Sequence, residues 1–253
     1  MDLKLKAKQL RTKMLTTASN VGRGHLGGAL SCTDILIALY YQDFLKNNNF
    51  VLSKGHSAIA LYTILNDLGK LAPYDLSYFC QNGSVLAEHP SILIPGVVAT
   101  TGSLGHGLGI ATGMALADKL AENNRKTYVL VGDGECNEGS IWEAVQFAAE
   151  QELGNLHMII DRNGLRSTDE DRRYDLQNIL SSFGWFTTIV NGHDYKDLTE
   201  AFTYVPIPPF RRPRAYIAYT TKGKGISFME NDVRWHNGVP KGILLQKALQ
   251  ELL

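Results

Sequence analysis

Short apolar runs alternate with helical patterns through the second half of the chain, and this alternation most restricts the possible folds. Four of the runs read as strands, with a helical pattern between each and the next: 127–131, 156–160, 185–190 and 214–219. Strands that alternate with helices predict a mostly parallel sheet covered by helices on both faces. We therefore expect an α/β protein, and since no linker or repeat interrupts the pattern, one domain over residues 1–253.

The first half of the chain adds more helices and one short strand. The predicted elements are a strand at 50–52 and helices at 4–19, 31–41 (capped by Ser31), 57–68, 104–123 and one that opens at Pro73. Four glycines in the helix at 104–123 each cost roughly 1 kcal/mol against alanine, which suggests close approach of a ligand or tight helix packing. Residues 22–27, GRGHLG, follow a helix rather than a strand, so they do not predict a dinucleotide site.

Charge and cysteine content exclude several classes of protein. Lysine plus arginine and aspartate plus glutamate number 25 each, so nothing favours binding to nucleic acid or to an anionic membrane. The three cysteines include no CxxC pair, which argues against a thiolate zinc site and fits a reducing compartment. The sequence shows no signal peptide and no apolar run of about 18 residues, so we expect a cytoplasmic protein.

Polar residues follow two of the predicted strands directly. Gly132-Asp133-Gly134 comes after the strand at 127–131, and Asn163 follows the strand at 156–160. Ligands of α/β proteins bind at the carboxyl ends of strands. Carboxylate, amide and carbonyl oxygens suit Mg²⁺ or Ca²⁺, and the glycines let the backbone approach an anion. Either segment alone would usually be a turn, and it is their spacing of 31 residues that indicates a site.

This spacing resembles the thiamine diphosphate (ThDP) fingerprint, a GDG followed about thirty residues later by Asn. The histidine-containing segments narrow the resemblance to the N-terminal, diphosphate-binding half of transketolases. The segments that carry it, in the family's order, are GHLGGALS (24–31), LSKGHSA (52–58), EHP (88–90), TGSLGHGLGIATGMALA (101–117), GDGECNEGSIWEA (132–144), DRNGL (161–165) and WHNG (235–238). The fold implied is the ThDP-binding α/β fold.

The resemblance implies a role for each matching residue. The side chains of Asp133 and Asn163 and the carbonyl of Leu165 would ligate Mg²⁺ (or Ca²⁺). Catalytic or substrate-channel positions would be His25, His89 and His236, with Glu138 in a carboxylate network across a subunit interface. Further residues that would contact the cofactor are His56, Ser103, Leu104, Gly132, Gly134, Glu135 and again His236.

The histidines suit the implied chemistry, because ketol transfer moves protons on and off sugar hydroxyls and imidazole titrates near neutral pH. We interpret His157 and His193 as structural. Two positions depart from the family. His106 stands where Gln is frequent, and Glu88 stands where Gly is more usual.

The chain ends at Leu253, before the pyrimidine-binding and C-terminal domains of a transketolase. We therefore expect a split enzyme with a separate C-terminal subunit, as an α2β2 heterotetramer acting on sugar phosphates or modified sugars. Two alternatives stay open. One is a subunit of another ThDP enzyme, similar to 1-deoxyxylulose-phosphate synthase or to the α subunit of a 2-oxo acid dehydrogenase. The other is a non-catalytic cofactor-binding subunit.

Overall fold

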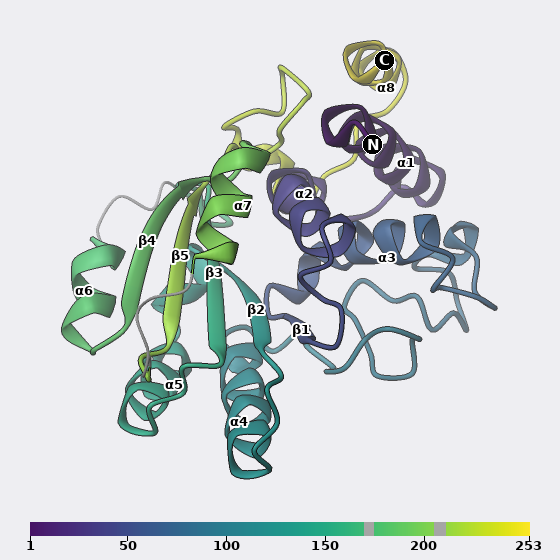
Figure 1. The fold of residues 1–253 in the computed structure, drawn as a ribbon. Coiled ribbons are helices and arrows are strands. Elements are labelled where there is room, and N and C mark those ends of the chain that lie inside the picture. The colour runs from purple at the N-terminus through teal and green to yellow at the C-terminus, as the bar shows by residue number, and fades with distance from the viewer. Residues whose placement is uncertain (170–174, 205–210) are drawn as a thin grey trace.

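A five-stranded sheet, parallel throughout, forms the centre of the computed structural model, which describes residues 1–169, 175–204 and 211–253 (Figure 1). The strand order is β1-β2-β3-β5-β4. Their bounds are β1 Asn49–Leu52, β2 Thr127–Gly132, β3 Leu156–Arg162, β4 Phe186–Asn191 and β5 Arg214–Tyr219. The predicted α/β class with a parallel sheet is confirmed.

Helices cover both faces of the sheet. One hydrophobic cluster packs the first face against α1 (Leu3–Val21), α2 (Leu26–Tyr41), α3 (Ala58–Asp67), α7 (Tyr195–Thr203) and α8 (Ile243–Leu252). A second cluster packs the opposite face against α4 (His106–Leu120), α5 (Gly139–Glu150) and α6 (Leu176–Ser182). Figure 1 shows these two groups of helices on either side of the strands.

The side chains of β2 alternate between the two clusters, so the strand is buried on both faces of the sheet. Tyr128 and Leu130 belong to the first cluster, whereas Val129 and Val131 belong to the second. Successive side chains of a strand point to opposite faces, so a strand covered on both sides reads as a continuous apolar run. This is why the strand at 127–131 could be recognised from the sequence.

Strand register brings the polar segments to one edge of the sheet. Gly132 pairs with Asp161 across β2 and β3, and Asp161 pairs with Ala218 across β3 and β5. The residues that follow these three strands therefore meet at the carboxyl edge, where the sequence predicted a site.

Three predicted helix starts were wrong. Helix α2 begins at Leu26 rather than Ser31, so Ser31 lies inside the helix, with its hydroxyl 2.9 Å from Gly28 O, and does not cap it. No α-helix opens at Pro73, where only a 3₁₀ turn follows at Leu76–Tyr78. Helix α4 begins at His106, two residues late, because Gly105 has a left-handed backbone (φ 85°).

No helix among the described residues is long and apolar enough to cross a bilayer.

Candidate cofactor-binding site

Asp133 and Asn163 lie side by side where β2 and β3 end, as their positions predicted. Asp133 accepts hydrogen bonds from the backbone N–H of Gly164 (2.6 Å) and of Gly134 (2.8 Å). Asn163 Oδ1 accepts from Leu165 N at 3.2 Å. Four of these five residues, all except Gly164, line one pocket. The three expected metal ligands are thus brought together.

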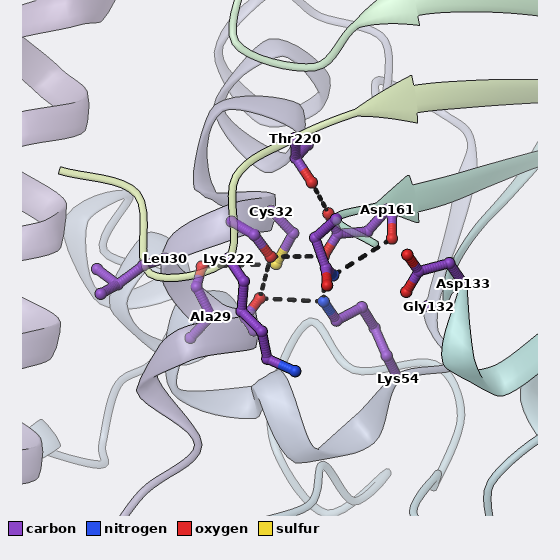
Figure 2. Close-up of polar contacts among 12 residues, drawn as sticks. Ala29, Leu30, Cys32, Lys54, Gly132, Asp133, Asp161, Thr220 and Lys222 are labelled. Carbon is purple, nitrogen blue, oxygen red and sulfur yellow. Dashed lines mark hydrogen bonds and ion pairs between the residues drawn. The ribbon is translucent and has the colours of Figure 1, made fainter. Parts of the chain in front are cut away.

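A buried ion pair between Lys54 and Asp161 lies beside this pocket. Asp161, fully buried, accepts from the ammonium of Lys54, from Ser31 Oγ (2.6 Å) and from Thr220 Oγ1. Burial alone would raise the pKa of Asp161, but Lys54 and these hydrogen bonds hold it below its ordinary value. Lys54 also donates to Gly28 O at 3.0 Å, and Figure 2 shows these bonds gathered around Asp161. With its oxygens already bonded, Asp161 supports the site.

Asp133, in contrast to Asp161, has no lysine ammonium bonded to it among the described residues. Burial and the nearby charge of Asp161 raise the pKa of Asp133 to about 6, although N–H donors at Gly164 and Gly134 oppose the shift. The Arg162 guanidinium approaches it only to 3.7 Å. A carboxylate in this position is stabilised by a cation, and the neighbouring amide and carbonyl oxygens are hard donors.

The donor set suits a hard cation better than zinc. Among the residues that the structure describes, no cluster of three or more His, Cys, Asp or Glu side chains is arranged to hold a metal. One carboxylate, one amide and one carbonyl leave coordination positions for ligand oxygens, as magnesium prefers when it binds with a phosphate. The residues present therefore fit a Mg²⁺–diphosphate group.

Lys222 is a site residue that the sequence reasoning missed. Its ammonium donates to Leu165 O (3.1 Å) and Arg166 O (3.0 Å), and it lies 2.9 Å from His236 Nδ1. Burial and the charge of Lys54 lower the pKa of Lys222 to about 8. No motif marks this lysine, because its place depends on how β5 ends next to β3.

Three imidazoles lie close together beside the pocket, and two of them, His56 and His236, line it. The ring centroids of His25, His56 and His236 lie 5.3 to 5.5 Å from one another. Burial, and to a smaller extent the charge of nearby Lys222, lowers the pKa of His236 to about 4. Burial also lowers the pKa of His56 well below its ordinary value. Neutral rings of this kind can each donate and accept a proton.

His25 differs because it has an acidic neighbour. Its Nδ1 lies 2.9 Å from Glu88 Oε1, an ion-pair distance. Burial lowers the pKa of His25, while Glu88 partly opposes that shift. His89 lies outside the group of three rings, is exposed, and packs its ring against Gly102. The unusual Glu88 therefore contacts a predicted substrate-channel histidine directly.

Known protein families include sequences similar to this chain. The sequence model described as "Transketolase, thiamine diphosphate binding domain" matches residues 3–242. The chain belongs to the transketolase family. Its fold and its ThDP-binding domain, both expected from the sequence, are confirmed.

Curated relatives fall into two lengths. The chain is 37% identical to one of the subunits of the apulose-4-phosphate transketolase of Phocaeicola vulgatus, over 99% of this chain and 93% of that protein. It is 35% identical to the transketolase of Homo sapiens, over 99% of this chain but only 42% of that protein. The chain thus spans nearly all of the first relative and less than half of the second.

A solved structure agrees with this family. The transketolase of Campylobacter jejuni superposes with a TM-score of 0.88 at 28% identity, over 99% of this chain and 42% of that one. Because the match extends over almost the whole chain, the transketolase fold includes both helical layers described above.

The remaining predicted residues differ in their surroundings within this site. Glu135 is buried, with its oxygens accepting from Ser53 Oγ (2.5 Å), Gly105 N (2.9 Å) and Gly132 N (3.0 Å). These bonds tie the GDG segment to the start of α4. Glu135 lines the pocket, but its oxygens are already bonded to the protein.

Leu104 and Glu138 line the rim of the same pocket, and Leu104 is 40% exposed. Ser103 lies in the exposed turn beside Leu104. His106 lies elsewhere, in a groove between α4 and α5. The departure at His106 therefore does not alter the pocket wall.

Proposed function

We propose that this chain is the diphosphate-binding subunit of a transketolase, an enzyme that moves a two-carbon ketol unit from a ketose to an aldose. The observation that carries the proposal is the presence of a buried carboxylate, Asp133, and a buried lysine, Lys222, in one pocket at the carboxyl edge of the sheet. The family relationship supports the same activity.

The metal would be held by Asp133, Asn163 and the carbonyl of Leu165. The diphosphate would meet the backbone at Gly132 and Gly134, together with His56, His236 and the ammonium of Lys222. Leu104 would pack on the cofactor from the rim, beside Ser103, with Glu135 holding the loop. Bound ThDP supplies the electron sink that lets a carbon–carbon bond next to a carbonyl break.

The histidines would handle protons of the sugars. His25 and His236, with pKa values lowered by burial, are neutral at physiological pH and can accept a proton from a hydroxyl and return it. His89, exposed on the loop before α4, would contact the sugar farther out. Glu138, at the rim, would face a carboxylate of a neighbouring subunit.

The names of the relatives support a proposal for the partner and the substrates. Two relatives are named as subunits of an apulose-4-phosphate transketolase. We propose a separate chain that supplies the pyrimidine-binding and C-terminal domains, assembled as α2β2, and a phosphorylated ketose as donor. Because such sugars are charged and stay inside cells, we also propose that the enzyme works in the cytoplasm.

Purification of the tagged chain from its native host tests the proposal. A stoichiometric companion chain and ThDP-dependent ketol transfer by the pair, but not by this chain alone, are expected. Measurable transfer by the purified chain alone would contradict the two-chain enzyme.

The variant Asp133→Ala separates catalysis from scaffolding. It should still assemble with the companion, yet lose metal-dependent ThDP binding and all activity. Full activity in the reconstituted variant complex would indicate a non-catalytic subunit instead.

A further inference from the structure

His193, which we predicted to be structural, connects a buried charged cluster to the segment that carries Lys222. It lies in the turn between β4 and α7. Its Nδ1 is 2.7 Å from Asp34 Oδ2, and its Nε2 accepts a 2.9 Å hydrogen bond from the backbone N–H of Thr221. The imidazole thus bridges helix α2 and the first residues after β5.

The two partners fix the protonation of the ring. Asp34 is held as a carboxylate: burial opposes its charge, but bonds from His193, Arg11 and Tyr195 lower its pKa to about 2. A carboxylate can only accept, so the proton of the neutral imidazole lies on Nδ1. The N–H of Thr221 can only donate, so Nε2 carries the lone pair. Asparagine or an apolar residue cannot satisfy both partners at these positions.

The segment after β5 is fixed at three successive points. Thr220 Oγ1 donates to Asp161, Thr221 N donates to His193, and Gly223 N donates to Gly27 O at 3.0 Å. Lys222 lies between the second and third points. Its long side chain must reach the pocket from this backbone, so the position of its ammonium depends on these bonds.

We infer that His193 is a positioning residue for cofactor binding, which holds Lys222 in place for the diphosphate through the backbone of Thr221. The inference rests on the proposed function, because it assigns Lys222 to the diphosphate. It gives the cluster of Arg11, Asp34 and Tyr195 a purpose beyond stability, since that cluster orients the imidazole from behind.

A double-mutant cycle tests this inference in the chain reconstituted with its companion, with ThDP and Mg²⁺ titrated by calorimetry. His193→Asn places an amide N–H near Asp34 but offers Thr221 no acceptor. It should weaken ThDP binding by about tenfold, the effect of one lost hydrogen bond. Lys222→Met removes a charged donor and should weaken binding by about 30-fold. The double variant should bind within about twofold of Lys222→Met, because the two residues act as one unit.

Multiplied losses in the double variant, about 300-fold, would overturn the inference, as would unchanged affinity in His193→Asn. His157→Asn is the control: this histidine is buried and is bonded to Tyr216 OH at 3.0 Å, away from the site. It should lower the melting temperature while the dissociation constant stays within about twofold.

Two further outcomes are informative. If His193→Asn does not fold, His193→Gln serves, because its amide oxygen can reach the position of Nε2. It should bind ThDP within about twofold of the wild type, and a tenfold loss would overturn the inference. Absence of ThDP binding by the wild-type chain reconstituted with its companion, in contrast, would contradict the proposed function itself.

Discussion

Replacing Asp133 by asparagine should stabilise the cofactor-free chain while it abolishes metal binding. The side chain is 2% exposed. Burial and Asp161 raise its pKa from 3.8 to about 6. Since one pKa unit corresponds to about 1.4 kcal/mol, ionised Asp133 lowers the free energy of unfolding by about 3 kcal/mol at neutral pH. A neutral amide removes that penalty.

Part of the gain is lost through hydrogen bonding. The two carboxylate oxygens accept from Gly164 N and Gly134 N, whereas asparagine has one oxygen and would point its NH₂ group at the other N–H. That mismatch costs about 1 to 2 kcal/mol. The net stabilisation expected at about pH 7.5 is therefore about 1 to 2 kcal/mol.

The pH dependence separates the electrostatic effect from the hydrogen-bond loss. Because the folded-state pKa of Asp133 exceeds the unfolded-state value, its favourable contribution is complete below about pH 4 and is lost as the pH rises through about 6. Between about pH 4.5 and pH 7.5 the difference in unfolding free energy should shift by about 2 kcal/mol toward Asp133→Asn.

Denaturant unfolding in the presence of a chelator measures this shift at both pH values. The control is Asp43→Asn, at an exposed position whose left-handed backbone (φ 61°) asparagine tolerates. Because this side chain is exposed rather than buried, the substitution removes no buried charge and should not reproduce the stabilisation expected of Asp133→Asn. A shift near zero, or one that favours the wild type as the pH rises, would refute the account of Asp133. Calorimetry with Mg²⁺ and ThDP should show no binding to Asp133→Asn.

Three other changes have defined outcomes. Lys54→Met leaves its carboxylate partner on β3 buried without a cation and should lower the free energy of unfolding by about 3 to 5 kcal/mol; a loss below about 1 kcal/mol in denaturant unfolding would argue against the ion pair. ThDP–Mg²⁺ affinity should fall below about pH 6, as Asp133 takes up a proton, and above about pH 8, as Lys222 loses one; a flat calorimetric profile would contradict both assignments. At Gly107 a Cβ would overlap a hydroxyl oxygen at the end of β1, whereas Gly109 faces open space. Thermal unfolding should therefore show that Gly107→Ala is destabilised by about 1 to 3 kcal/mol. The control, Gly109→Ala, should not be destabilised.

The sheet could be predicted because its strands are continuous apolar runs. The strand expected at 214–219 coincides with β5, and that expected at 127–131 ends one residue short of β2. Helix starts were harder. Serine is a residue type that often caps helices, yet the hydroxyl of Ser31 bonds to Asp161, 130 residues away. Nothing local in the sequence distinguishes a serine that caps a helix from one that supports a site across the domain.

The same contrast divides the residues of the site. Asp133 and Asn163 were predictable because each directly follows a strand, so the fold itself brings them together. Lys54 and Lys222 were not, since their partners are carbonyls and carboxylates on distant segments. A role for His193 could be inferred only once the bond to Thr221 was known.

The charges of the site explain why metal and diphosphate should bind together. Two carboxylates and two lysines lie close to one another. Lys54 and Asp161 form a direct ion pair. Burial raises the pKa of Asp133 and lowers the pKa of Lys222, so the charge of each residue is destabilised. A cation beside Asp133 and an anion beside Lys222 relieve both at once. Each ligand should therefore raise the affinity for the other by the same factor, and equal Mg²⁺ affinities with and without inorganic diphosphate would disprove this coupling.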